Sequence, residues 1–150
     1  MQIYLVSVIS VRIVKSMNSQ TVKDIGYFIL RFGLGALMAR HGWPKITGGT
    51  EMWADVGSGI SVIGITFWPT VWGFCAAVAE FVGGICVAVG FLHRPACGII
   101  VFTMFIAFLN SFGGTNTFGD WNHVAELGIA FLGMLLMGPG RFSLSVSVNK

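Results

Sequence analysis

The chain has 150 residues, of which 55% are hydrophobic and only 10% are charged. An ordinary soluble domain carries about 25% charged residues, so this composition excludes that class. The formal net charge of +3 comes without a cluster of Lys and Arg, which excludes a nucleic-acid-binding surface. A chain of this length is expected to form one domain, here an integral membrane protein.

Residues 1–23 are predicted to form a leader that lies in the cytoplasm or on the membrane surface. Residues 1–14 are apolar but short, contain Arg12, and lack both a basic amino-terminal stretch and a small-residue cleavage site. They therefore do not resemble a secretory signal peptide, and a membrane-surface segment is the alternative interpretation. Met17 offers an alternative start of the chain.

Four apolar segments follow, each long enough or nearly long enough to cross about 30 Å of hydrocarbon. Their approximate bounds are 24–41, 71–92, 95–112 and 121–138. Helices of water-soluble proteins need a polar face, which these segments lack. The predicted fold is therefore an all-α membrane protein, a four-transmembrane-helix bundle over residues 24–145, with a tail over 146–150.

The first span and the connection after it have recognisable boundaries. Asp24 stands where a capping acid belongs, and Gly42 with Pro44 is expected to end the first helix at about residue 41. The connection that follows is the longest in the chain. Its stretch 51–65 is rich in Gly and Ser but carries apolar residues at helical spacing, which predicts a short interfacial helix in the first outer loop.

The distribution of charge predicts the topology. Lys and Arg dominate the leader, the short second connection and the tail, whereas acidic residues occur in the first and third connections. By the positive-inside rule, both termini and the second connection lie in the cytoplasm. The five Trp residues then fall at or beyond the outer interface, where indole rings favour the headgroup level.

Small residues form one smooth face of the second span. Gly73, Ala77 and Gly84 recur on it at helical spacing, together with Glu80. Because small residues let helices approach closely in lipid, this face is expected to pack against another helix. It is also the predicted contact with other membrane subunits or with a second copy of the chain.

Two charges lie deep within the predicted spans. Arg31 stands about nine residues before the outer end of its helix, and Glu80 about nine residues after the outer start of its own. Both would then lie at a similar depth, where an ion pair would offset the cost of burying each charge. Such a pair serves either to fix the helix register or to place Glu80 as a proton carrier or ligand contact, and both roles stay open.

His123 and Glu126 are three residues apart and share one face of the fourth span. With Glu80 they would line a polar pocket open to the outside, in which carboxylate and imidazole groups suit hydrogen bonding to a quinone carbonyl and proton exchange with it. His41 and Lys45 flank the first helix at the same outer level, as ligand contacts or as a solvated patch. A single His–Glu pair is too little for a metal site, so none is predicted.

The sequence lacks the other short motifs that would indicate a particular chemistry. The three Cys residues form no C-x-x-C pair and are expected to be small core residues. The sequence also contains no nucleotide-binding loop and no nucleophile elbow. Residue chemistry alone therefore predicts a buried polar site without a recognisable reaction.

Several motifs, taken in order, resemble the DoxX family of small integral membrane proteins over about residues 25–145. They are Arg31 followed by HGWPK at 41–45, AEFVGG at 79–84, GFLHRPA at 90–96, Glu126, and GPGRFSL at 138–144. The resemblance implies a four-helix membrane fold in the cytoplasmic membrane of a bacterium or archaeon. It also implies a link to quinone-linked redox complexes, since the family is named after a subunit of a thiosulfate–quinone oxidoreductase.

The leading functional hypothesis is a small membrane subunit that binds quinone or moves protons for a quinone-linked oxidoreductase. Arg31, Glu80, His123 and Glu126 would line its site. The first alternative is a non-catalytic structural or assembly subunit of a larger membrane complex. A small-solute transporter ranks last, because four short helices give little room for an aqueous pathway in a monomer.

Overall fold

The computed structural model describes residues 19–112 and 118–144, with the side chains of 118–120 left out, and the described residues are helical without any strand. Its helices are α2 (Ser19–Thr47), α3 (Gly49–Ser58), η1 (Gly59–Ile63), α4 (Pro69–Val89), α5 (His93–Phe112) and α6 (Phe118–Met137). The all-α prediction is therefore confirmed for this part of the chain. Most of the predicted leader and the whole tail over 146–150 lie outside the described residues.

The first long helix, α2, extends beyond both of its predicted ends. Asp24 does not cap it but lies inside it, where its carboxylate accepts a hydrogen bond from Gln20 and pairs with Arg141 at 3.7 Å. The predicted stop at Gly42 and Pro44 is also wrong, because the helix continues through both to Thr47. A proline inside a helix removes one backbone hydrogen bond, and the close packing of this end against α4 outweighs that loss.

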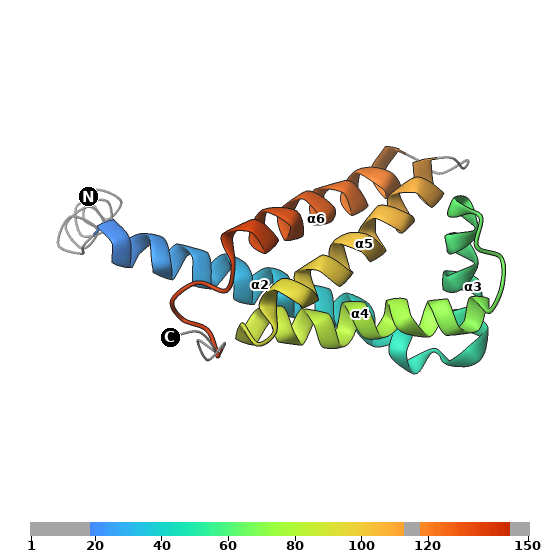
Figure 1. Ribbon diagram of the computed structural model, residues 1–150, viewed down its shortest axis with the longest axis horizontal. Coiled ribbons are helices and arrows are strands. Elements are labelled where there is room, and N and C mark those ends of the chain that lie inside the picture. The colour runs from blue at the N-terminus through green and yellow to red at the C-terminus, as the bar shows by residue number, and fades with distance from the viewer. Residues whose placement is uncertain (1–18, 113–117, 145–150) are drawn as a thin grey trace, which may run out of the picture.

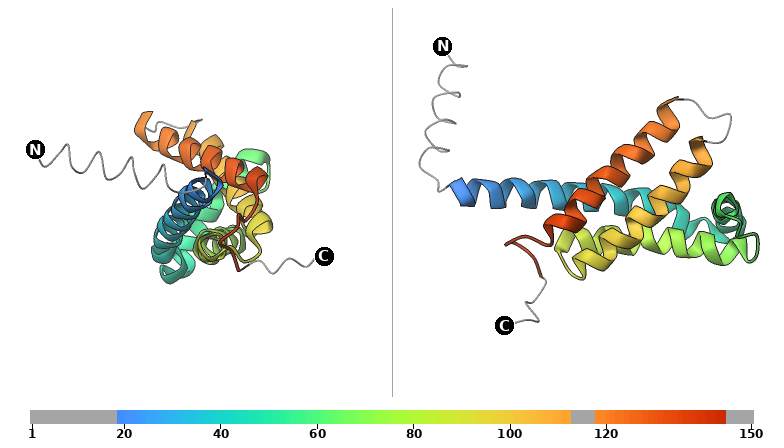
Figure 2. Two further views of the ribbon diagram at one scale, coloured as in Figure 1. Left: turned by 90° about the vertical axis from the view of Figure 1, so that its left-hand side faces the viewer. Right: turned by 45° about the horizontal axis from the view of Figure 1, so that its top comes forward.

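The packing of α2 on α4 depends on glycine. A Cβ atom added to Gly84 would lie 2.5 Å from the backbone nitrogen of Ala39, and one added to Gly35 would lie 2.5 Å from that of Ala88. The two antiparallel helices, side by side in Figures 1 and 2, thus touch backbone to backbone. This confirms that the small-residue face of α4 is a packing surface.

The same contacts correct the prediction that this face binds other subunits. Gly73, Ala77 and Gly84 are all buried within the chain. Gly84 lies against α2, and Gly73 lies against the backbone carbonyl of Trp53 in α3. The face is already covered by the chain's own helices, so it is not available to a partner.

The short helix predicted at 51–65 is present as α3 and η1. Figure 1 shows α3 lying across the end of α4, and Gly57 of α3 packs against the backbone of Pro69 and Gly73. Trp53 fixes the other side of α3, because its Nε1 donates to the carbonyl oxygen of Lys45 at 2.8 Å. The connection after the first helix is therefore a packed element that closes one end of the molecule.

The second pair of helices, α5 and α6, packs side by side and diverges from the α2–α4 pair toward α3 (Figures 1 and 2). Where the four helices meet, a buried cluster forms the core: Met38, Val87, Ala96, Cys97, Ile100, Met104, Phe131 and Met134. Gly138, at φ +81°, ends α6 as predicted, since this left-handed backbone favours glycine. The buried Cys97 fits the prediction of a small core residue, but the prediction is wrong for Cys75, which is exposed, and Cys86 is only partly buried.

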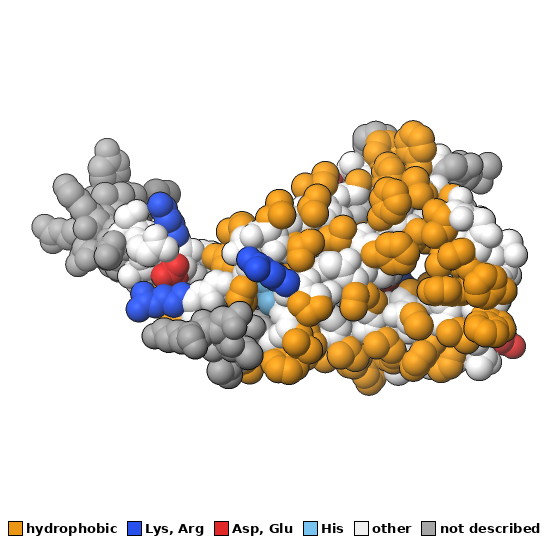
Figure 3. Space-filling model, in the orientation of Figure 1, with side chains coloured by type: hydrophobic (Ala, Val, Ile, Leu, Met, Phe, Trp, Pro, Cys, Tyr) orange, Lys and Arg blue, Asp and Glu red, His pale blue; other side chains and the backbone are white. Residues whose placement is uncertain are grey.

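Much of the face drawn in Figure 3 is apolar, as its hydrophobic side chains show. Ile99 and Phe102 of α5 and Ile129 and Leu136 of α6 are all more than half exposed. Among the described residues, α4 and α5 are long and apolar enough to cross a membrane, and α6 contains a shorter apolar helix from Trp121 to Met137. The membrane class is thereby supported, while the crossing by α2 and α6 stays a prediction.

Candidate functional site

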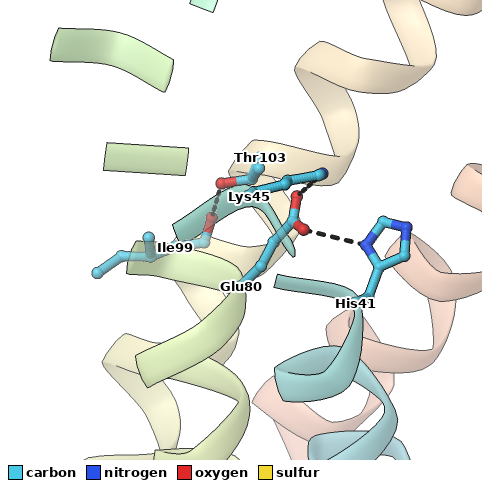
Figure 4. A network of polar contacts seen from close by, with 5 residues as sticks. All are labelled: His41, Lys45, Glu80, Ile99 and Thr103. Atoms are coloured by element: carbon cyan, nitrogen blue, oxygen red, sulfur yellow. Dashed lines mark hydrogen bonds and ion pairs between the residues drawn. The ribbon is translucent and has the colours of Figure 1, made fainter. Parts of the chain in front are cut away.

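Glu80 is the most deeply buried acid among the described residues, with 1% of its surface exposed. Both of its carboxylate oxygens have partners from α2: Nζ of Lys45 lies 2.6 Å from Oε1, and Nδ1 of His41 lies 3.0 Å from Oε2 (Figure 4). Because an ionised carboxylate only accepts hydrogen bonds, both nitrogens donate to it. These two contacts offset the cost of removing the charge from water.

The local fold of α2 explains why these three side chains meet. His41 and Lys45 are four residues apart and lie on one helix face only because the helix continues through Pro44. Gly42 lets this face approach α4, since a Cβ there would lie 2.5 Å from the backbone nitrogen of Phe81. The glycine and proline that were expected to end the helix are thus part of the structure that builds the site.

Arg31 does not pair with Glu80, so the predicted ion pair is wrong. It is buried near the middle of α2, where its guanidinium donates to the carbonyl oxygens of Pro139 at 2.8 Å and Phe142 at 2.5 Å. Arg31 lies beside Gly90, which is ten residues, or about 15 Å, further along α4 than Glu80. The estimate of equal depth failed because α2 extends six residues beyond its expected end.

A second buried polar cluster surrounds Arg31, and sequence reasoning missed it. The hydroxyl of Tyr27 donates to the carbonyl oxygen of Gly138, and Nε2 of His93 lies 3.1 Å from that of Met134. Tyr27 and His93 also approach each other at 3.3 Å. These donors satisfy the carbonyl groups at the end of α6, so the cluster holds that helix and the following segment in place.

Of the two residues predicted on α6, His123 lies at the edge of the site and Glu126 lies outside it. The ring of His123 lies with its centroid 6.5 Å from that of His41, at the exposed edge of the carboxylate network. Glu126 is exposed and instead accepts a hydrogen bond from Asn122 on its own helix at 3.0 Å. The structure therefore joins His41, Lys45 and Glu80 directly, adds His123 at their edge, and places Arg31 and Glu126 elsewhere.

A cavity of about 520 Å³ lies beside Glu80 and Lys45, between α4, α5 and the α3–η1 segment. Its walls are mostly apolar, with Val56, Ile60, Ala76, Ile99 and Phe102 among them. Its polar members include Lys45, Glu80, Trp72, Thr103 and Asn110. Thr103 donates to the carbonyl oxygen of Ile99, which leaves its hydroxyl oxygen free to accept (Figure 4).

A second cavity, of about 480 Å³, lies on the other side of Lys45 and is lined by Arg40 and His41 as well. The two cavities share Lys45, Asp55 and Val56. His41 is 49% exposed and contacts the buried Glu80, so the network connects the solvent-exposed surface of α2 to the first cavity. No group of three or more His, Cys, Asp and Glu in the described chain is arranged to hold a metal ion.

These features define an all-helical membrane protein with a buried carboxylate network in the wall of an apolar cavity. The DoxX family model matches residues 26–112, more than half of the chain, and the chain belongs to this family. The match contains His41, Lys45 and Glu80 but ends before α6 and His123. No curated protein and no solved structure matches the chain.

Proposed function

We propose that this DoxX protein is a membrane subunit that binds quinone for a quinone-linked oxidoreductase. The quinone head group would occupy the cavity between α4 and α5, with a ring carbonyl near Lys45 and Glu80. The observation that carries the proposal is the position of this buried ion pair, in the wall of a cavity whose other walls are mostly apolar. Such a site suits a lipid-soluble molecule with a polar ring.

The side chains around the cavity suit both hydrogen bonding and proton exchange. The Lys45 ammonium has three donors and gives one to Glu80, so it keeps donors for a ligand carbonyl. Glu80 contacts the exposed His41, through which a proton can pass between solvent and the carboxylate. The electrons of any quinone reaction would come from a redox subunit of the complex, since this chain contributes binding and proton exchange.

The proposed location is the cytoplasmic membrane of a bacterium or archaeon, with both termini in the cytoplasm. The start of α2, the turn between α4 and α5 and the end of α6 lie at one end of the molecule (Figure 1). That end carries Lys23, Arg94 and Arg141, whereas α3 at the other end carries Glu51 and Asp55. The positive-inside rule then places the basic end inside, and all four long helices would cross the bilayer.

Binding of decylubiquinone and of menadione to the purified protein in mild detergent tests the proposal. We expect saturable binding that Glu80→Gln weakens about tenfold, because the substitution removes the charge that orients Lys45. Glu126→Gln is the matched control, since Glu126 is exposed and bonded within its own helix. If neither quinone binds, or if both variants bind as the wild type does, the proposal is wrong.

A structural or assembly subunit is the second candidate, and the cluster around Arg31 favours it. That cluster uses the partly buried Tyr27 and the buried Arg31 and His93 to fix the end of α6 and its following segment, which is a structural role for three polar residues. Because the small-residue face of α4 is covered by α2 and α3, a partner would have to contact the exposed apolar faces of α5 or α6. A reproducible larger complex without bound quinone would support this candidate.

A further inference from the structure

An apolar groove of about 400 Å³ runs along the line of contact between α4 and α5. Its floor is formed by small residues, the buried Ala79 and Ala96 and the half-buried Gly83. Larger, exposed side chains such as Val82 and Leu92 stand along its edges. None of the described side chains that line it carries a charge, a hydroxyl or an amide. The groove therefore suits an alkyl chain and offers no partner to a polar group.

The groove continues the cavity that the proposed function assigns to the quinone ring. Cys75, Ala79 and Ile99 line both spaces, so the two meet at these three side chains. From there the groove follows α4 to Cys86 and reaches Leu92, in the segment between α4 and α5. Cys75 and Cys86 are separated by about 16 Å along the helix axis. A space of this length beside the ring cavity has the shape required by a chain attached to the ring.

The position of the groove in the bilayer fits the same ligand. Among the described residues, the helices long and apolar enough to cross a membrane are α4 and α5, which form the groove. The ring cavity lies toward α3, and the groove extends from it toward the opposite end of these two helices (Figure 1). With the proposed topology, the ring would lie nearer the outer interface and the chain in the hydrocarbon core, where each part of a lipid quinone is most stable.

We propose that the groove holds the apolar side chain of the quinone whose ring occupies the adjoining cavity. This inference rests on the proposed function and makes the ligand a lipid quinone with an alkyl or isoprenoid chain. The groove offers the chain close packing, which drives association within a membrane because lipid tails are as apolar as the protein surface. The acyl chain of a phospholipid is the competing occupant. A bound ring holds its own chain at the entrance of the groove, which favours the quinone chain over a separate lipid.

The first experiment titrates detergent-solubilised wild type, Gly83→Leu and Gly98→Leu with duroquinone, which has no chain, and with decylubiquinone, which has a decyl chain. Gly83→Leu places a side chain on the groove floor, against the flexible end of Ile100, whereas a Cβ at Gly98 meets nothing within 4 Å and lies outside the groove. We expect Gly83→Leu to weaken decylubiquinone binding about fivefold, since the chain loses dispersion contacts, and to leave duroquinone binding unchanged. Gly98→Leu should change neither. An equal effect of Gly83→Leu on the two quinones, including no effect, overturns the inference alone, whereas no binding of either quinone to the wild type overturns the proposed function with it.

The second experiment uses only the wild type and follows the N-ethylmaleimide modification of two native cysteines by peptide mass spectrometry. Cys75 lies where the groove meets the ring cavity, whereas the partly buried Cys86 lines the groove but not the ring cavity. We expect duroquinone to slow the reaction of Cys75 alone, and decylubiquinone to slow the reactions of both cysteines.

The outcomes of this labelling separate the chain from the ring and from other lipids. If decylubiquinone protects Cys75 but not Cys86, the inference is wrong and the proposed function stands. If n-decanol at the same concentration protects Cys86 equally well, the groove accepts any alkyl chain, which also overturns the inference. If neither quinone protects Cys75, the proposed function is overturned together with it.

Discussion

The Nζ atom of Lys45 lies 2.6 Å from Oε1 of Glu80, although the two residues belong to different helices and Glu80 is almost completely buried. The contact depends on the last two turns of α2, which continue past Gly42 and Pro44 and carry Lys45 onto the side of α4. Lys45 itself is 23% exposed, so the pair joins a buried acid to a base that still reaches the cavity. This asymmetry has consequences for stability.

Removing Lys45 should destabilise the protein more than neutralising Glu80. Lys45→Met leaves a buried carboxylate with His41 as its only partner in the network, at an expected cost of about 2–3 kcal/mol. Glu80→Gln leaves an amide of the same size beside a lysine that can turn toward solvent, and should cost about 1 kcal/mol. Thermal unfolding in one detergent measures both, and a larger loss for Glu80→Gln would contradict the assignment of Glu80 as an ionised group.

The approach of α2 to α4 at Gly42 should not tolerate a side chain. Gly42→Ala places a Cβ 2.5 Å from the backbone nitrogen of Phe81 and 2.9 Å from the Cβ of Glu80. Such overpacking is expected to cost about 1–3 kcal/mol and to separate Lys45 from Glu80, which should also weaken quinone binding.

Gly33 supplies the matched control on the same helix. A Cβ at Gly33 meets nothing within 4 Å, so Gly33→Ala should leave the protein unchanged or stabilise it by up to about 1 kcal/mol through its helix propensity. Similar melting temperatures for the two variants would contradict the close packing of α2 on α4.

The segment after α6 should loosen when Arg31 loses its planar donors. Arg31→Lys keeps the charge but cannot reproduce the two hydrogen bonds to Pro139 and Phe142. We expect faster tryptic cleavage after Arg141, measured by mass spectrometry, because the backbone there is no longer held. Arg40→Lys, at an exposed position on the same helix, is the control and should leave the cleavage rate unchanged.

Maleimide labelling should distinguish the cysteines. Cys75 is exposed and lines the proposed ligand cavity, whereas Cys97 is completely buried in the core. N-ethylmaleimide is therefore expected to modify Cys75 first, and excess decylubiquinone should slow that reaction at least severalfold by occupying the cavity. Decylubiquinone is the protecting ligand because its ring is fully substituted, whereas menadione adds thiols and would block Cys75 directly. Labelling of Cys75 that decylubiquinone does not slow would argue against a ligand beside it.

The helical, membrane-embedded character of the chain could be predicted because it depends on composition and on the spacing of apolar residues, which are local properties. The positions of α4 and α5 followed directly from their apolar runs and from the prolines and glycines beside them. The end of α2 could not be predicted, because Gly42 and Pro44 normally end a helix and only tertiary contact with α4 explains why they do not. That single error also misplaced Arg31 relative to Glu80.

In the candidate site, too, the local features could be predicted from the sequence, and the contacts between helices could not. The sequence singles out Glu80 because a lone acid in an apolar span needs a partner, and it predicts His41 and Lys45 at the outer level, as ligand contacts or as a solvated patch. Their direct contact with Glu80 depends on the register between two helices, which the sequence does not encode locally. The sequence indicates only that Trp72 is an interfacial aromatic residue, because the burial of its Nε1 atom depends on the side chains that surround it in the fold.

The central claim is that a quinone occupies the cavity beside Lys45 and Glu80. Native mass spectrometry of the protein purified from its own membranes, followed by solvent extraction, measures this directly when wild type is compared with Ala76→Phe, which fills part of the cavity and keeps both residues of the ion pair. We expect about one quinone per chain in the wild type and almost none in Ala76→Phe. Absence of quinone from the wild type, or equal amounts in both proteins, would contradict the claim.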